Sequence, residues 1–266
     1  MSDRGIPRIS LTLRKKTGTA LRRFSMIQPD DSVLIGLSGG KDSLVLALVL
    51  AAYQRRSPVP FSLAAAFVDI TGGSADTAPL QAFCDSLGIP FFVRPYPILS
   101  ILAEREERSP CSFCANLRRG ILNDEARERG CTTLALGHTL DDAVETVLMN
   151  LFRAGQFKSF QPKVWQSRTE ITVIRPLILA EGRLGAKEEA RLSLPVGENP
   201  CPFSGNTERK RTADIISTLC AENPAIKYNI IHALECLDER NRWTGTPSFD
   251  SSEQGEMIWE KSTESL

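Results

Sequence analysis

The sequence predicts an α/β fold, a doubly wound parallel sheet followed by a helical C-terminal extension. Three observations predict it. Short apolar runs alternate with helical stretches, the first two runs are apolar at nearly every position, and a glycine turn joins the first run to a helix. Alternation of this kind is typical of βα units. Continuous apolar strands are typical of a sheet that helices cover on both faces.

The expected strands are Ser32–Leu37, Phe61–Ile70, Pro90–Arg94, Thr132–Gly137 and Ile171–Leu177. The expected helices are Leu44–Arg56, Ala75–Leu87, Ala115–Arg129, Leu140–Ala154, Gly182–Leu194, Thr207–Ala221 and Pro224–Asp238. The first helix is apolar almost all round, which indicates a buried helix. Ligands of such sheets bind beyond the carboxyl ends of the strands. The glycine turn, Asp69 and His138 follow three of the strands, so we expect all of them at this edge.

Composition excludes some classes of protein. The chain has 266 residues and equal numbers of acidic and basic residues, 32 of each, so its net charge does not indicate a nucleic-acid partner. The charge is uneven, however, because residues 1–23 carry seven Lys and Arg against Asp3 alone, and a basic arm suits a phosphate backbone. No run of 18 apolar residues occurs and the N-terminus lacks the apolar core of a secretion signal. We therefore expect a cytoplasmic protein without membrane contact.

The turn Gly36-Leu-Ser-Gly-Gly-Lys-Asp-Ser43 predicts a phosphate-binding loop. Backbone N–H groups converge at such a turn, and the dipole of the following helix favours negative charge there. A Walker loop needs Gly, four residues, and then Gly-Lys-Ser/Thr. Gly36 is one position out of that register and Asp42 stands where the hydroxyl is required, so the Walker type is excluded.

Three of the seven cysteines predict a metal centre. Cys111 and Cys114 form a Cys-x-x-Cys pair, and Cys201 lies on a proline-bounded loop. Such a pair suits two metal ligands or a redox dithiol. A structural zinc site usually closes with four ligands, whereas three thiolates suit an iron–sulfur cluster with one iron free. The other cysteines, which are Cys84, Cys131, Cys220 and Cys236, are expected to be buried apolar residues.

The segment Ser38–Ser43 resembles the PP-loop of the ATP pyrophosphatases, which cleave ATP to AMP and pyrophosphate. Four further blocks resemble the tRNA 2-thiocytidine synthetases of that superfamily. They are Cys111-Ser-Phe-Cys-Ala-Asn-Leu-Arg-Arg-Gly120, Ala135-Leu-Gly-His-Thr-Leu-Asp-Asp142, Val173-Ile-Arg-Pro-Leu177 and Pro200-Cys201. The likeness extends from about Arg14 to about Asp238.

The resemblance implies that the chain replaces O2 of cytidine 32 in tRNA with sulfur, by way of an adenylated base. It implies ATP, Mg²⁺ and a 4Fe-4S cluster as cofactors, with Cys111, Cys114 and Cys201 as cluster ligands. The residues expected around the nucleotide are Ser38, Gly39, Gly40, Lys41, Asp42, Ser43, Asp69, Gly137, His138, Asp141 and Asp142. Lys41, Asp42 and the three cysteines are the expected catalytic residues, and Asp42 or Asp141 would hold Mg²⁺. The chain departs from the family at Thr139, where a second His is common, and at Ser204, where a second late cysteine is common.

The implied organisation has four parts. They are a basic helical arm at 1–30, the ATP domain at 31–180, a helical extension at 181–240 that carries Cys201, and a disordered tail at 241–266. Expected partners are tRNA, a sulfur donor such as a cysteine desulfurase, and a second copy of the chain in a homodimer.

Other functions stay open at this point. They are thiolation of uridine in tRNA, lysidine synthesis, an ammonia-using synthetase, and a non-catalytic iron–sulfur sensor. Lysidine synthesis needs no cysteine cluster, an ammonia-using synthetase needs a source of ammonia, and a sensor would release no pyrophosphate.

Overall fold

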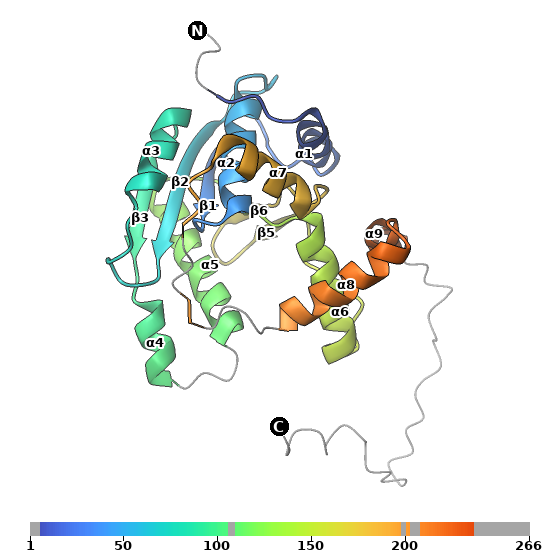
Figure 1. Ribbon diagram of the computed structural model, residues 1–266. Helices are drawn as coiled ribbons and strands as arrows, with labels where there is room; N and C mark the ends of the chain where they lie inside the picture. Colours follow the sequence, from blue (N-terminus) through green and yellow to red (C-terminus); the bar gives the residue numbers. More distant parts are fainter. Residues whose placement is uncertain (1–5, 106–109, 198–200, 203–207, 237–266) are drawn as a thin grey trace.

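The computed structural model describes residues 6–105, 110–197, 201–202 and 208–236 (Figure 1). Within them, a central six-stranded sheet has the strand order β3-β2-β1-β4-β6-β5. The strands are β1 Ser32–Leu37, β2 Ser62–Asp69, β3 Phe91–Pro95, β4 Thr133–Ala135, β5 Lys163–Gln166 and β6 Ile171–Ile174. The helices are α1 Leu11–Arg23, α2 Lys41–Gln54, α3 Ala78–Leu87, α4 Ile98–Arg105, α5 Pro110–Glu128, α6 Leu140–Ala154, α7 Gly182–Leu192, α8 Glu208–Glu222 and α9 Ile226–Glu235.

The predicted fold class is confirmed, with one strand more than expected. All neighbouring strands pair in parallel except β5, which runs antiparallel to β6 at the edge of the sheet. β5 has only four residues, too few to show a period of two, and a short turn joins it to β6. The sheet is therefore mostly parallel, with one antiparallel strand at this edge.

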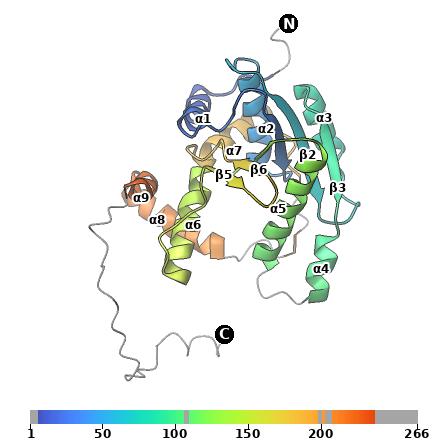
Figure 2. The ribbon, with the colours of Figure 1, turned by 180° about the vertical axis from the view of Figure 1, so that it is seen from behind.

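Helices cover both faces of the sheet, as Figures 1 and 2 show from opposite sides. Side chains of α1, α2 and α3 share one buried cluster with β1 and β2. Side chains of α4 and α5 fill a second cluster on the opposite face. A third, smaller cluster joins α6 to α8 and α9. The C-terminal helices are therefore packed on α6 and not on the sheet itself.

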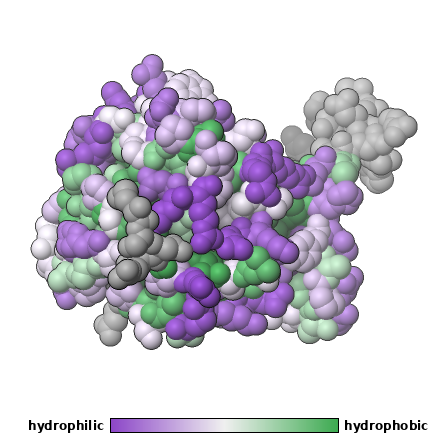
Figure 3. All heavy atoms as spheres, turned by 90° about the horizontal axis from the view of Figure 1, so that it is seen from above, coloured by the Kyte–Doolittle hydropathy of each residue, from purple (hydrophilic) through white to green (hydrophobic). Residues whose placement is uncertain are grey.

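The basic N-terminal segment forms α1, which is amphipathic. Leu13, Ala20 and Leu21 are buried, while Arg14, Lys15 and Arg22 lie on the exposed side. Figure 3 shows the molecule from the side on which α1 and the C-terminal end of α2 lie, and hydrophilic residues predominate on this face with smaller apolar areas between them. α1 therefore joins the core on one side and presents positive charge on the other.

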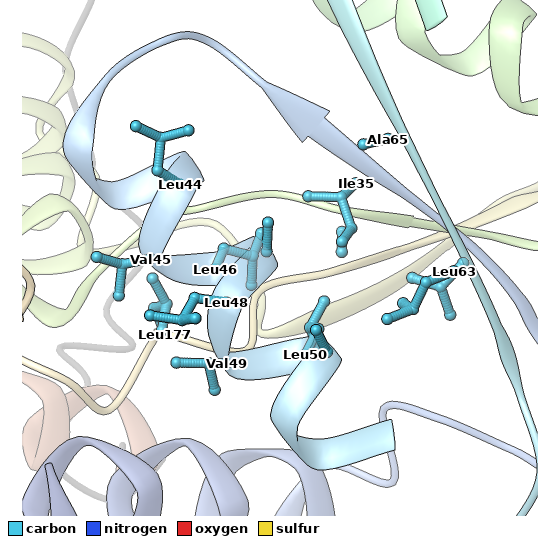
Figure 4. Packing of buried hydrophobic residues seen from close by; sticks show 14 of the residues in the cluster. Ile35, Leu44, Val45, Leu46, Leu48, Val49, Leu50, Leu63, Ala65 and Leu177 are labelled. Carbon is cyan, nitrogen blue, oxygen red and sulfur yellow. The ribbon is translucent and has the colours of Figure 1, made fainter. Parts of the chain in front are cut away.

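The helix that follows the glycine turn is the centre of the core (Figure 4). Nine consecutive residues of α2, Ser43–Ala51, are buried, which confirms the expected buried helix. Leu46 and Leu50 face Ile35 of β1 and Leu63 of β2 in Figure 4. Burial of one leucine side chain contributes about 1.5–3 kcal/mol, so this packing fixes the glycine turn at the end of β1.

Two helices differ from expectation. α5 begins at Pro110 and not at Ala115, so the Cys-x-x-Cys pair lies inside the helix rather than before it. Proline is favoured at the first helical position, because its missing N–H is not needed there. α4 was not predicted, since it is short and continues directly into the charged segment before Pro110.

No helix in the part of the chain that the structure describes is both long and apolar enough to cross a bilayer. The four-part division of the chain stays a prediction. The tail expected to be disordered, 241–266, lies outside the described residues.

Candidate active site

The site lies where the strand order reverses. β1 is paired with β2 on one side and with β4 on the other, so the loops after β1 and β4 leave the sheet side by side. Ile35 and Ala135 are partners in the parallel register. Ser38 and His138 each come three residues later, and the topology therefore brings the glycine turn and the His138 segment together.

One hydroxyl holds the glycine turn in shape. Ser43 Oγ accepts a hydrogen bond from the Ser38 backbone N–H at 3.1 Å and lies 3.2 Å from Ser38 Oγ. It also donates to the Gly40 carbonyl at 2.8 Å. Gly39 has a φ of +77°, which favours glycine. These contacts leave the N-terminal turn of α2 open to an anion, as expected of a phosphate cradle.

Lys41 and Asp42 form an ion pair inside the turn, with Lys41 Nζ 2.5 Å from Asp42 Oδ2. Asp42 Oδ1 is buried and has no hydrogen-bond partner among the described residues. Burial raises the pKa of the Asp42 carboxyl, and the Lys41 ammonium opposes that effect. An oxygen-seeking cation beside Asp42 would satisfy the orphaned oxygen, so the surroundings of Asp42 fit the magnesium role.

Glycine at position 137 allows the loop after β4 to approach α2. A Cβ on Gly137 would lie 3.0 Å from the Asp42 carbonyl oxygen and 3.1 Å from Ser43 N. Gly185 of α7 plays a similar part, since a Cβ there would lie 2.9 Å from Asp42 Oδ1. Both glycines are needed for space, and neither has a side chain that could bind a ligand.

His138 is held neutral by its surroundings. Burial, and then the positive charge of Arg175, lower the pKa of His138 to about 4. Arg175 Nε donates to His138 Nδ1 at 3.3 Å, and its NH1 donates to the Gln161 carbonyl at 2.6 Å. Because arginine only donates, the proton of the neutral ring is on Nε2. Phe160 packs against both groups, with its ring centroid 4.8 Å from that of His138.

The start of α6 brings two carboxylates to the site in different ways. Asp142 lines the cavity described below and caps its own helix by accepting the Thr139 N–H and hydroxyl, both at 2.8 Å. Asp141 is occupied on both oxygens, by Gly182 N at 2.6 Å and Lys227 Nζ at 2.5 Å, and it is not part of that cavity. Thr139, where a second His is common in the family, is therefore a helix cap in this chain.

A cavity of about 450 Å³ joins the glycine turn to α5. On one side it is lined by Ser38 to Ser43 except Gly39, and by Gly137, His138, Asp142 and Arg175. On the other side it is lined by Ala115, Arg118, Arg119 and Leu122, which share one face of α5. The helix that begins with the Cys-x-x-Cys pair thus forms a wall of this cavity.

The three cysteines expected to hold a metal centre approach one another. Cys111 and Cys114 lie in the first turns of α5, three residues apart and so on one side of the helix. Residues 201–202 run beside α5 in both views (Figures 1 and 2). Burial raises the pKa of the Cys114 thiol, Arg118 lowers it, and negative charge on Cys201 and on Cys111 raises it further. Cysteine sulfurs are the soft ligands that iron–sulfur clusters take, so the donor set fits such a cluster.

The described residues do not form a finished metal site. No three or more His, Cys, Asp or Glu side chains within 6–105, 110–197, 201–202 and 208–236 are arranged to hold a metal ion. Residues 198–200 and 203–207, on both sides of Cys201, lie outside the described part, and so does Ser204. The ligand roles of Cys111, Cys114 and Cys201 stay predictions.

Asp69 has a local structural role. Its carboxylate is buried and accepts four hydrogen bonds, from Thr71 N, Thr71 Oγ1, Gly73 N and Ala75 N, at 2.6–3.2 Å. Burial works to raise the pKa of this carboxyl, and the hydrogen bonds together lower it. Asp69 shapes the loop after β2 and does not line the cavity, so its predicted contact with the nucleotide stays a prediction.

Sequence reasoning missed several features. Arg118 and Arg119 line the cavity, which the sequence did not indicate. Glu145, one turn after Asp142, has its pKa raised to about 7, chiefly by burial. Cys84 and Cys131 are buried as expected, whereas Cys220 is half-buried and Cys236 is exposed at the end of α9, so the expectation for Cys236 was wrong.

Comparison with known proteins identifies relatives. Residues 12–183 match the PP-loop domain family. The tRNA-cytidine(32) 2-sulfurtransferase of Geobacter metallireducens is 35% identical over 86% of this chain and 91% of the relative. The tRNA-cytidine(32) 2-sulfurtransferase of Anaeromyxobacter dehalogenans is 35% identical over 86% of this chain and 80% of the relative. Among solved structures, the U34-tRNA thiolase NcsA from Methanococcus maripaludis with its 4Fe-4S cluster is 30% identical, with a TM-score of 0.69 over 85% of this chain and 77% of that one.

Proposed function

This chain belongs to the PP-loop family and groups there with the tRNA-cytidine(32) 2-sulfurtransferases, and we propose that it uses ATP to replace O2 of cytidine 32 in tRNA with sulfur. The observation that carries the proposal is the shared cavity. One helix, α5, carries two of the cysteines in its first turns and lines the phosphate-loop cavity with Arg118 and Arg119. Activation of the base and delivery of sulfur are thus assigned to adjacent places.

The residues of the cavity suit adenylation of the base. The oxygen at C2 is a poor leaving group, and attack of this oxygen on the α-phosphate of ATP turns it into part of an AMP ester while pyrophosphate departs. Negative charge develops on the phosphates during this step. The N–H groups of the glycine turn, the Lys41 ammonium and the guanidinium groups of Arg118 and Arg119 surround the space in which that charge would form.

Asp42 is our candidate for the magnesium ligand. It lines the cavity and has one buried oxygen without a partner among the described residues, whereas both oxygens of Asp141 are occupied. Mg²⁺ typically takes one or two carboxylates together with phosphate oxygens. When bound, the ion would neutralise part of the triphosphate charge.

Cys111, Cys114 and Cys201 are our candidates for cluster ligands. Three cysteine ligands would leave one iron of a 4Fe-4S cluster without a protein ligand, and that iron would supply a binding place for the sulfur. Arg118, which lines the cavity, lies one turn after Cys114, and its charge opposes the rise that burial causes in the pKa of the Cys114 thiol.

Neutral His138 supplies a hydrogen-bond donor to the cavity. Arg175 occupies Nδ1, so the ring presents Nε2–H. Because the pKa of His138 is about 4, this donor persists at neutral pH without adding positive charge. We propose that it orients the nucleotide or the base and does not transfer a proton.

The experiment uses the full chain, reconstituted with iron and sulfide without oxygen, and supplied with ATP, Mg²⁺, sulfide and tRNA. We expect 2-thiocytidine in the digested tRNA by mass spectrometry, and pyrophosphate release that requires tRNA. Formation of 2-thiouridine instead would contradict the target base. Absence of both products from a chain that holds its cluster and binds ATP would contradict the reaction.

Two variants test the cysteine ligands and the ATP-binding residues separately. Cys111→Ala should abolish thiolation and the broad visible absorption of the cluster while leaving ATP affinity within about twofold, whereas exposed Cys236→Ala should change none of these. Lys41→Ala should weaken ATP binding by about tenfold or more, since a hydrogen bond to a charged group contributes about 1.5–3 kcal/mol. Thiolation by Cys111→Ala at the normal rate would remove that residue from the ligand set.

Three further parts of the proposal concern the setting of the enzyme. We expect it to act in the cytoplasm, where its tRNA substrate is made. We also expect sulfur to come from a donor such as a cysteine desulfurase, and the active form to be a homodimer. Mixing with a desulfurase and measuring mass in solution would test the last two.

A further inference from the structure

A basic groove lies between α1 and the C-terminal end of α2. Two adjoining hollows of about 670 Å³ and 290 Å³ share Ile9, Arg14, Ala52 and Arg56 in their linings. Together they are lined by six basic residues, which are Arg8, Arg14, Lys15, Arg22, Arg55 and Arg56. No acidic residue lines either hollow within the described part of the chain.

The shape of this groove depends on buried contacts. α1 packs on the core through Leu13 and Leu21, which turns its basic side outward. The segment before α1 is fixed because Ser10 N donates to Glu188 at 2.9 Å. At position 18 a Cβ would lie 3.3 Å from Arg22 NH1, so glycine leaves room for the Arg22 side chain along the helix. The groove is therefore a defined shape and not a loose terminal segment.

Three of the basic side chains that line the groove have no acidic partner among the described residues. The sequence contains no Asp or Glu from residue 6 to 24 or from residue 43 to 68. Glu188, the acid that contacts the start of α1, already pairs with Arg191 at 2.5 Å. Arg14, Lys15 and Arg22 are exposed and form no ion pair with another described residue. Such a surface attracts a polyanion.

We propose that this groove binds the phosphate backbone of the tRNA at a distance from the target base, an inference that rests on the proposed function. α2 begins at the phosphate loop and ends at the groove, and its 14 residues span about 20 Å. One RNA molecule is long enough to contact both places. Five of the six basic residues are arginines, whose planar guanidinium groups suit phosphate, and backbone contacts require no particular base.

The test measures how tRNA binding to the full chain depends on salt. The variant carries Arg14→Gln with Arg55→Gln, and the matched control carries Arg127→Gln with Arg168→Gln, which removes the same charge from exposed positions outside the groove. Each lost phosphate contact lowers the slope of log K against log salt by about 0.7–0.9. Affinity of the unaltered chain should therefore fall roughly 7- to 12-fold more than that of the groove variant between about 50 and 200 mM salt.

The outcomes distinguish failure of the groove proposal from failure of the proposed function. We expect the control to keep the slope of the unaltered chain, and all three proteins to bind ATP equally. An unchanged slope in the groove variant overturns the proposal, even if the unaltered chain thiolates tRNA. Loss of binding to anionic lipid vesicles with unchanged tRNA binding also overturns it, since a membrane would then be the occupant. Failure of the proposed function would instead appear as absence of tRNA-dependent pyrophosphate release from the unaltered chain.

Discussion

Replacing Gly137 with alanine tests the close packing of the loop after β4 on the phosphate loop. The added Cβ would lie 3.0 Å from the Asp42 carbonyl oxygen and 3.1 Å from both Asp42 C and Ser43 N. Ordinary contacts of a Cβ begin at 3.4 Å, so the separation must grow by a few tenths of an ångström. All three atoms are backbone atoms at the start of α2, and no side-chain rotation relieves the contact.

The expected cost follows from this geometry. Overpacking of a close-packed site costs about 1–3 kcal/mol. For a chain of this size, about 1 kcal/mol corresponds to a shift in melting temperature of roughly 2–4 °C, so we expect a decrease of about 2–12 °C. The same displacement moves the amides that would bind phosphate, and we expect the dissociation constant for ATP to rise about tenfold, equivalent to about 1.4 kcal/mol.

The assay compares thermal unfolding and ATP titration calorimetry of Gly137→Ala with those of Gly120→Ala. Gly120 is an exposed glycine within α5, and a Cβ there would meet nothing within 4 Å. Gly120→Ala should stabilise the fold by about 0.5–1 kcal/mol through helix propensity and leave ATP affinity unchanged. If Gly137→Ala unfolds and binds ATP like the unaltered chain, our explanation of glycine at this position is wrong.

Three further predictions concern buried ionisable side chains. Folding lowers the pKa of His138 from 6.5 to about 4, so the neutral ring stabilises the fold fully above pH 6.5 and this stabilisation is lost as the pH falls to about 4. Over this range, urea unfolding should show the free energy of unfolding of the unaltered chain decrease by about 3 kcal/mol more than that of His138→Gln. Equal decreases would count against a buried neutral ring. Folding raises the pKa of Glu145 from 4.5 to about 7, so the fold loses stability as the pH rises and this side chain ionises. Glu145→Gln should therefore be more stable than the unaltered chain at about pH 8.5 and not at about pH 5. The same difference in stability at both pH values would refute this. Asp69→Asn should cost about 1.5–3 kcal/mol because its amide N–H₂ would face backbone donors, while exposed Asp76→Asn should cost much less; equal costs would contradict the role of Asp69.

The phosphate loop was predictable because its chemistry is local. Strand, turn and helix follow one another within Ser32–Gln54, and residue type alone indicates both the turn and the buried helix. The meeting of this loop with His138 was also predictable, because parallel strands end at one edge of the sheet. These features depend on short-range order and on one general rule of α/β sheets.

Other features depend on long-range contacts that one sequence does not display. The side chains of Arg118 and Arg119 belong to the cavity only because α5 packs across β2, β4 and β6. The ion pair of Asp141 with Lys227 forms only because α9 packs against α6. β5 was not predicted because a strand of four residues at a sheet edge is too short to show an alternation of apolar and polar residues. The start of α5 at Pro110 had a signal, a proline suited to the first helical position, that was not used.

The way in which α5 is fixed has a mechanical consequence. Its C-terminal half is held by buried Ile121 and Ala126 and by Glu125, which pairs with Arg94 and Arg129, whereas its cysteine-bearing end is half-buried or exposed. The helix spans about 15 Å from Ile121 to Cys111, and on this stretch Phe113, Cys114 and Leu117 are only partly buried against the core. A tilt of about 5° at Ile121 would move the Cys111 end by roughly 1.3 Å, about half the length of a metal–sulfur bond. Small strains at the far edge of the sheet, near Arg94, are thereby amplified at the sulfur atoms.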